Sequence, residues 1–403
     1  MACTATTPPP PPERPSPPAT VPVPVDPVTT APSPSLPSST ERAVLPSPNR
    51  LNLEIGRLDP EWVWPMLDFA SDSFAVIWSS GALDGPAGDG APDLWRYVPG
   101  QPEPELLWRN PERDRQLAKV AGDTDVWAFA EISSLGKRWW DLWLLTEPGG
   151  EPIKLDSHPG DEDIPSLVPS FDVDAGRVAW TAFDRGGGGT AVSQLWMAEA
   201  PDWEPHLLAE GDAAERAYWL PSLRGQQLAY VDVAIGDDPS EDVRHVMLMD
   251  VAPGAGAPRQ LDESGNATMP ILLDDGVVWK EPDRGFAMFN WGKLFRYSFE
   301  DEAVSTLRTG PQEYVNYPSG GNRFVAAWGA DAFDFAVHDL ERGASRLIAT
   351  YDNGVDSIRR PHVAGDLLVW LHSRDDEQGT GPPSPIEYAW LPEAGADRGD
   401  RPP

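Results

Sequence analysis

The chain has very little cysteine and no long apolar run. Its single cysteine, Cys3, cannot form a disulfide within the chain, so the fold must be stabilised by packing. No stretch reaches the roughly 18 apolar residues that a membrane-spanning helix needs, and no hydrophobic segment of a signal peptide is present. The sequence as written therefore predicts a soluble chain.

Basic residues are scarce as well. The sequence holds 31 Lys and Arg against 64 Asp and Glu, which gives a formal net charge of −33. A surface with this excess of negative charge repels phosphate groups. The composition therefore argues against nucleic acid as a partner and against direct electrostatic docking on anionic membranes.

Enzyme signatures are missing too. The sequence contains no GxSxG elbow, HExxH motif, P-loop or CxxC pair. Nucleophilic and metal-dependent catalysis therefore have no candidate residue set in the sequence.

Proline, in contrast, is abundant at the N-terminus. The first fifty residues hold 16 of the 46 prolines and too few large apolar residues to bury a core. We expect a disordered tether over residues 1–48, a folded domain over 49–392 and a disordered tail over 393–403. Cys3 precedes the tether, as the lipidated cysteine of a bacterial lipoprotein does, which favours export with a lipid anchor. A cytoplasmic chain with an incidental cysteine is the alternative.

The folded part repeats a short motif about every 50 residues. An apolar stretch that ends in an aromatic residue recurs with spacings of 49, 53, 50, 49, 49 and 42 residues. The aromatic residues are Trp78, Trp127, Trp180, Tyr230, Trp279, Trp328 and Trp370. A period near 50 with short strands is typical of β-propeller blades, and we expect the aromatic residues to fill the space between blades.

Each repeat carries signals for four strands. A proline-led strand and a tight turn precede the aromatic strand, as in "WLPSLRGQQLAY", and an apolar strand and an edge strand follow. The sequence therefore predicts an all-β fold, a seven-bladed β-propeller of four-stranded antiparallel blades. The last repeat lacks an edge strand, so we expect the alternating segment Leu51–Ile55 to pair with the last blade and close the ring.

This pattern resembles the repeats of the TolB-like, or WD40-like, propeller family over about residues 50–392. The "SPDG" turn of that family occurs here only in altered forms such as "PSLRGQ" and "PHVAGD". The resemblance implies a binding or scaffolding propeller that is often exported. It carries no catalytic residues over to this chain.

The long connections between second and third strands are expected to gather with the blade-to-blade connections on one face, where we expect the ligand. The candidate binding residues are Trp139, Trp140, Arg185, Arg284, Phe289, Trp291, Arg359 and Arg360. The aromatic rings could stack on a sugar or anchor a protein, or fold back over the rim of the core. The arginines could bind an anionic group or pair with neighbouring carboxylates.

Acidic clusters in the same loops, at Asp161–Asp163 and Asp237–Asp242, raise the question of calcium. Neither has the alternating spacing of an EF-hand loop, so solvated charge is favoured. No metal or cofactor is predicted, and calcium is the alternative.

These observations favour a monomeric, non-enzymatic propeller, exported or at the cell envelope, that binds a protein or glycan through its long-loop face. Contact with a membrane is expected only through Cys3. The alternative is a propeller-fold glycan hydrolase or lyase with acidic residues at the central channel. An enzyme needs titratable groups that converge at one mouth of the channel, whereas a binder needs a shaped, partly apolar surface.

Overall fold

The chain divides into two units, Met1–Ser47 and Pro48–Pro403. The computed structural model describes residues 55–58, 65–69, 76–80, 93–99, 101, 103–111, 115–133, 139–159, 167–186, 189–282, 292–307, 315–321, 323–329, 334–349, 356–374 and 386–391. These residues form β-strands and turns, and no helix among them could span a membrane.

The strands form seven blades of four antiparallel strands in the described part of the chain, and a single pair between Gly292 and Val315 joins blades 5 and 6 into one eight-stranded sheet. Blades 1 and 2 contain β2 (Pro65–Phe69), β3 (Val76–Ser80), β4 (Leu94–Tyr97) and β5 (Glu105–Trp108), then β6 (Arg115–Gly122), β7 (Trp127–Ser133), β8 (Trp139–Leu145) and β9 (Ile153–Pro159). Blades 3 and 4 contain β10 (Phe171–Asp174), β11 (Arg177–Arg185), β12 (Ala191–Glu199) and β13 (His206–Asp212), then β14 (Arg216–Arg224), β15 (Gln227–Ala234), β16 (Val243–Asp250) and β17 (Arg259–Gln260). Blades 5 and 6 contain β18 (Thr268–Leu273), β19 (Gly276–Pro282), β20 (Gly292–Ser298) and β21 (Ala303–Leu307), then β22 (Val315–Gly320), β23 (Phe324–Gly329), β24 (Asp334–Asp339) and β25 (Ala344–Ala349). Blade 7 contains β26 (Asp356–Ala364), β27 (Leu367–Arg374), β28 (Ile386–Trp390) and β1 (Ile55–Leu58).

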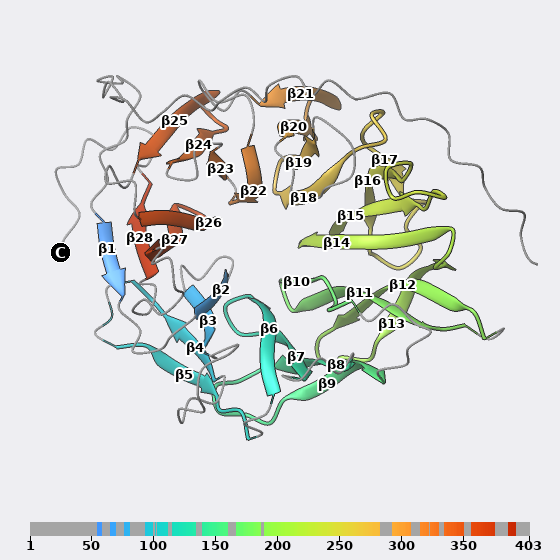
Figure 1. Ribbon diagram of the computed structural model, residues 1–403, viewed down its shortest axis with the longest axis horizontal. Helices are drawn as coiled ribbons and strands as arrows, with labels where there is room; N and C mark the ends of the chain where they lie inside the picture. The colour runs from blue at the N-terminus through green and yellow to red at the C-terminus, as the bar shows by residue number, and fades with distance from the viewer. Residues whose placement is uncertain are drawn as a thin grey trace, which may run out of the picture. The chain divides into compact units, whose positions relative to one another are not determined.

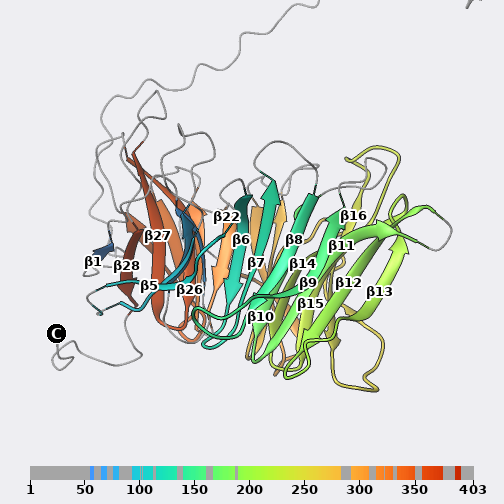
Figure 2. The ribbon, with the colours of Figure 1, turned by 90° about the horizontal axis from the view of Figure 1, so that it is seen from below.

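The blades stand around a common axis, and the first strand of each blade lies nearest the centre (Figure 1). Within a blade the strands follow each other from the centre outward, as in β10-β11-β12-β13. Figure 2 shows the strands running between two faces of the ring. We call the turns between first and second strands the inner hairpins. In blades 2 to 5 and in blade 7, where these turns are described, they lie at the opposite end of the blade from the end at which the second strand finishes and the third begins. The all-β propeller predicted from the repeats is confirmed.

Apolar residues that alternate along the strands pack each blade against both neighbours. In β19, for example, Val277 and Trp279 join a cluster with blade 4, whereas Val278 joins a cluster with blade 6. Buried clusters of this kind occupy each successive interface from blades 1 and 2 to blades 6 and 7. Because a strand presents alternate side chains to opposite faces, a near-continuous apolar run is what a strand buried on both faces requires.

Blades 7 and 1 are packed together as well. Tyr97 of β4 belongs to the same buried cluster as Leu367, Val369 and Ile386. Beside this cluster β1 pairs antiparallel with β28, from Ile55 opposite Ala389 to Leu58 opposite Ile386. Of the strand predicted at residues 51–55, residues 51–54 lie outside the described part, so that closing strand stays a prediction for them.

The aromatic residues of the repeat are buried between blades where their side chains are described. Trp127, Trp180, Tyr230, Trp279 and Trp370 are each at most 3% exposed. The side chains of Trp78 and Trp328 lie outside the description. The prediction that these aromatic residues are inter-blade core is therefore confirmed for five of the seven.

The cross-strand register corrects two of the repeat positions. Phe129 lies opposite Trp143, as Trp180 lies opposite Trp196, so Phe129 rather than Trp127 is the counterpart of Trp180. In blade 6 the counterpart of Trp279 is Ala327, which packs toward blade 5, and not Trp328.

The proline of the first strand stands in a β-bulge in blades 4 to 7. The register of the first strand shifts across Pro221, Pro270, Pro318 and Pro361. Proline has no N–H to donate to the ladder, and a bulge places it where the ladder is interrupted. The residues before two of these prolines, Leu220 and Met269, have positive φ angles of 51° and 53°.

Candidate functional site

Two of the predicted aromatic binding residues lie in a strand and not in a loop. Trp139 and Trp140 are the first residues of β8, where Trp140 lies opposite both Ile132 and His158. Trp140 is 1% exposed and belongs to the core between blades 2 and 3. The expectation that both rings project from a loop is therefore wrong, because the strong strand preference of tryptophan extends β8 to Trp139. Trp139 is half-buried.

The structure does not bring the other predicted residues together. Arg185 ends β11, is exposed, and donates a hydrogen bond from Nη1 to the carbonyl oxygen of Gly189 at 3.3 Å. Arg359 and Arg360 belong to the strand β26, and only their backbone is described. The remaining candidates, Arg284, Phe289, Trp291 and Cys3, lie outside the described residues, so their roles stay predictions.

Around Trp139 lies a cluster of charged and aromatic side chains, which we call the blade 2 cluster: Arg115, Glu131, Trp139, Asp141, Trp143 and Lys154. It lies at the long-loop end of the blade, because β6 and β8 begin there and β7 ends there. The guanidinium of Arg115 stands 5.0 Å from the centroid of the Trp139 ring.

Ion pairs and hydrogen bonds fix the blade 2 cluster. Arg115 Nη1 lies 2.9 Å from Glu131 Oε2 and 3.7 Å from Asp141 Oδ2, and Lys154 Nζ lies 2.6 Å from Asp141 Oδ1. Trp143 Nε1 donates to Glu131 Oε2 at 2.8 Å. Burial raises the pKa of the Glu131 carboxyl above its usual range, although the bonds from Arg115 and Trp143 oppose this.

Chemically, the blade 2 cluster combines two indole rings with two cations and two carboxylates. An arginine held over an indole ring presents a flat, amphipathic face, and such aromatic and arginine surfaces anchor protein and sugar ligands. Its carboxylates are both engaged by cations. Sequence reasoning found Trp139 but missed the rest, although Glu131 and Asp141 interrupt the apolar strands "WAFAEIS" and "WWDLWLL".

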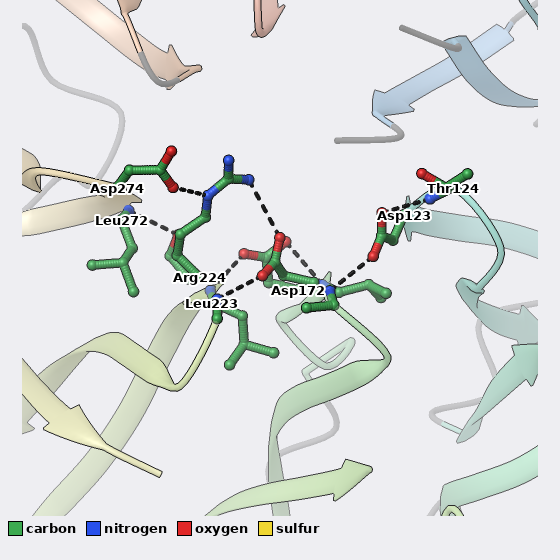
Figure 3. Close-up of polar contacts among 12 residues, drawn as sticks. Asp123, Thr124, Asp172, Leu223, Arg224, Leu272 and Asp274 are labelled. Carbon is green, nitrogen blue, oxygen red and sulfur yellow. Dashed lines mark hydrogen bonds and ion pairs between the residues drawn. The ribbon is translucent and has the colours of Figure 1, made fainter. Parts of the chain in front are cut away.

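A second feature lies on the opposite face, among the inner hairpins. A depression of about 360 Å³ is lined by side chains of four successive blades, including Asp123, Asp174, Arg224 and Asp274. Arg224 Nε donates to Asp274 Oδ1 at 2.6 Å (Figure 3). Asp123 lies on the inner hairpin of blade 2, two blades before that of Arg224. In the described part of the chain, carboxylates from three blades line this depression: Asp123, Asp174 and Asp274.

Burial and an arginine set the ionisation of Asp174. Its side chain is 8% exposed, its Oδ1 lies 3.3 Å from Arg224 Nη1, and its Oδ2 accepts the Gly225 N–H at 2.7 Å. Burial outweighs these contacts and raises the pKa of Asp174 from 3.8 to about 6. A perturbed carboxyl in a depression is a signal of functional sites in general, as well as of structural ion pairs.

A lysine in the repeat motif is also buried. Lys280 follows Trp279 in β19 and has no exposed surface. Burial lowers its pKa from 10.5 to about 8. The strand β19 continues past Lys280 to Pro282.

The acidic loop that follows β15 is organised by its own hydrogen bonds. Asp238 Oδ1 accepts the backbone N–H and the hydroxyl of Ser240, which lowers the pKa of Asp238, and Asp242 Oδ1 accepts the Gly236 N–H. Residues 161–163 lie outside the description. In the described ranges no three His, Cys, Asp or Glu side chains gather as metal ligands.

The sequence matches no protein-family model and no curated protein. Solved structures do share its fold. Oligogalacturonate lyase from Vibrio parahaemolyticus has a TM-score of 0.54 at 9% identity, over 85% of this chain and 98% of that one. The β-propeller domain of the Trilobed protease from Pyrococcus furiosus has a TM-score of 0.53 at 11% identity, over 77% of this chain and 90% of that one.

The tricorn protease is similar as well, with a TM-score of 0.52 at 10% identity over 76% of this chain. The match spans only 31% of that protein. Likeness at these identities supports the propeller fold and leaves activity open. Membership of the TolB-like family stays a prediction.

Proposed function

We propose that this protein is a non-catalytic binding propeller that holds a protein or glycan partner at the long-loop end of blade 2. The observation that carries the proposal is the pair formed by Trp139 and Arg115, with the guanidinium 5.0 Å from the ring centroid. Glu131 Oε2 lies 2.9 Å from Arg115 Nη1. This ion pair positions the guanidinium beside the Trp139 ring before a ligand binds. Pre-organisation of this kind lowers the entropy cost of binding.

Charge narrows the choice of ligand. The net charge of −33 repels anionic ligands over the whole surface, and the blade 2 cluster contributes two cations and two carboxylates. A neutral glycan or a basic protein surface therefore suits this site better than an acidic polysaccharide.

The enzyme alternative has one observation in its favour. Asp174, with a pKa of about 6, lies in a depression among the inner hairpins of blades 2 to 5, as a catalytic carboxyl could. The similar oligogalacturonate lyase is an enzyme on the same fold. Against this, Arg224 is engaged by Asp174 and Asp274 and cannot also neutralise a substrate carboxylate without breaking these pairs.

Binding to arrays of neutral glycans and of basic peptides tests the proposal. We expect the wild-type chain to bind members of one array and Trp139→Ala to lose about five- to thirty-fold in affinity, because stacking on the ring contributes about 1–2 kcal/mol. Arg115→Ala should weaken the same ligands.

Arg177→Ala is the matched control. Arg177 also pairs with a glutamate, Glu199, but it lies on the opposite face, where it donates a hydrogen bond to the carbonyl oxygen of Gly225. An equal loss of affinity in Arg177→Ala would contradict the assignment of ligand binding to the blade 2 cluster. Cleavage of oligogalacturonate by the wild type that disappears in Asp174→Asn would replace the proposal by the enzyme alternative.

A further inference from the structure

The charges of the blade 2 cluster differ in how far they are exposed. The side chains of Arg115 and Lys154 are 23% and 44% exposed, whereas those of Glu131 and Asp141 are 3% and 13% exposed. The two carboxylates lie opposite each other on β7 and β8. A ligand that approaches the cluster therefore meets hydrogen-bond donors with positive charge, and the carboxylates are much less accessible.

The two carboxylates are also engaged within the cluster. Glu131 Oε2 accepts hydrogen bonds from Arg115 Nη1 at 2.9 Å and from Trp143 Nε1 at 2.8 Å. Asp141 Oδ1 lies 2.6 Å from Lys154 Nζ, and its Oδ2 lies 3.7 Å from Arg115 Nη1. A basic side chain of a partner reaches either carboxylate only by displacing Arg115 or Lys154, and like charges placed side by side repel. A basic protein surface therefore fits the cluster poorly.

Given the function proposed above, on which this inference rests, we propose that the blade 2 cluster binds a neutral glycan and that Lys154 donates hydrogen bonds to its hydroxyl oxygens. An ammonium group has three N–H donors, so the exposed Lys154 can donate to a ligand while it keeps its ion pair with Asp141. A sugar unit offers an apolar face to the Trp139 ring and acceptor oxygens to the ammonium group. This combination of an apolar contact with a few fixed polar groups is what a specific ligand site requires.

Lys154 is held in position before a ligand binds. Its Nζ lies 5.4 Å from the centroid of the Trp143 ring and 2.6 Å from Asp141 Oδ1. Fixing a long side chain in advance removes part of the entropy cost of binding. The ammonium group therefore contributes to affinity for a ligand that accepts hydrogen bonds.

Charge favours a neutral glycan over an acidic one. The two cations and two carboxylates of the cluster sum to zero, whereas the whole chain has a formal net charge of −33. An acidic polysaccharide is repelled by the molecule at long range and finds no net positive charge at the cluster in return. A neutral glycan is not repelled, and it accepts the same hydrogen bonds from Lys154.

Calorimetric titration of the full chain tests the ligand class with three kinds of probe. The probes are four neutral tetrasaccharides (cellotetraose, xylotetraose, mannotetraose and galactotetraose), the acidic tetragalacturonate, and the basic peptide lysyl-tryptophanyl-lysine. We expect binding of at least one neutral tetrasaccharide and none of the other two probes.

Lys154→Met separates a glycan from a basic partner by the sign of its effect. The variant keeps the apolar stem beside Trp143 and removes the charged donor, so affinity for the neutral tetrasaccharide should fall about ten-fold, as on loss of one hydrogen bond from a charged group. If the partner were basic, the same variant would bind the peptide more tightly, because a like charge is gone.

Lys293→Met is the matched control, since Lys293 is the second residue of β20, at the corresponding end of blade 5. It removes the same charge away from the cluster and should leave glycan affinity unchanged. No binding of the neutral tetrasaccharides, or unchanged glycan affinity in Lys154→Met, overturns the inference. Peptide binding that requires Trp139 overturns it too but leaves the proposed function standing. Glycan binding that Trp139→Ala does not weaken contradicts the proposed function itself.

Discussion

At the scale of single residues, the inter-blade tryptophans are amphipathic. Trp180 has no exposed surface, and its Nε1 donates to Asp156 Oδ2 on the neighbouring blade at 2.7 Å. Trp279 and Trp370 likewise donate to Glu281 and Glu387 at 3.0 and 2.8 Å. Tryptophan suits these positions because its large ring fills the space between blades while its N–H donates a hydrogen bond to a carboxylate.

Trp180→Phe is expected to cost about 2 kcal/mol at pH 7, because it leaves a small cavity and takes a donor from the half-buried Asp156 carboxylate. Burial already raises the pKa of Asp156 above 3.8, and loss of the Trp180 bond raises it further. Stability from such a group is present below the unfolded pKa and is lost as the pH rises through the folded pKa. The cost measured by urea denaturation should therefore be smaller at pH 4 than at pH 7.

Trp279→Phe is the matched control for that measurement, since it removes the same ring atoms and a bond to Glu281 of its own strand, instead of a bond to a carboxylate of the neighbouring blade. An equal pH dependence in the two variants would show that the Asp156 carboxylate is not its source.

At the scale of elements, the residue after the proline of the first strand ties one blade to the next. Ser222 Oγ accepts the Leu272 N–H and Ser319 Oγ accepts the Val363 N–H, each at 3.0 Å. Blade 5 has Ile271 at this position, which has no acceptor. Instead Ile271 packs where only the glycine Gly320 leaves room, since a Cβ there would meet its Cγ2 at 2.9 Å.

Ser222→Ala should therefore lower the free energy of unfolding by about 1 kcal/mol, the usual cost of leaving one backbone N–H unpaired. Gly320→Ala should cost more, because the added methyl group overlaps Ile271. Urea denaturation measures both. A neutral Ser222→Ala would mean that water replaces the hydroxyl at Leu272.

The sequence predicts the strands of each blade well but not how they are aligned. Seven tryptophans and tyrosines at a regular spacing indicated the blades, yet the tryptophan nearest the expected position was out of register in blades 2 and 6. In blade 2 the inner hairpin is longer, since its turn spans residues 123–126 rather than two residues, as in 175–176. Hairpin length changes the register without changing the apolar pattern, so spacing alone cannot reveal it.

The candidate site was predicted only in part, for a similar reason. The run "KRWW" reads as the end of a polar loop, and nothing local tells that β8 begins at Trp139. Asp123, Asp174 and Arg224 read as ordinary turn residues. Their convergence follows from the ring, which brings residues about fifty positions apart side by side.

At the scale of the whole molecule, ring closure depends on packing between the first and last blades. Leu367 has no exposed surface and belongs to the cluster that contains Tyr97 of blade 1, while Leu228 is equally buried between blades 3 and 4. In an open repeat array the terminal interface would be weaker and would unfold first.

We therefore expect Leu367→Ala and Leu228→Ala to cost about the same, in the range of about 2–5 kcal/mol, and to unfold in one transition. Circular dichroism and tryptophan fluorescence followed through urea denaturation compare the two. A second, earlier transition in Leu367→Ala alone would show that the last blade separates from the first on its own.

The prolines of blades 4 to 7 also bear on what the channel can admit. The innermost strand of a propeller blade has an edge with no partner, and such an edge would ordinarily recruit an extended peptide. Pro221, Pro270, Pro318 and Pro361 each lack a backbone N–H and stand in a bulge that interrupts the regular extended geometry of this strand. A polypeptide threaded through the axis would find no continuous ladder to extend there, which leaves side-chain contacts as its means of attachment.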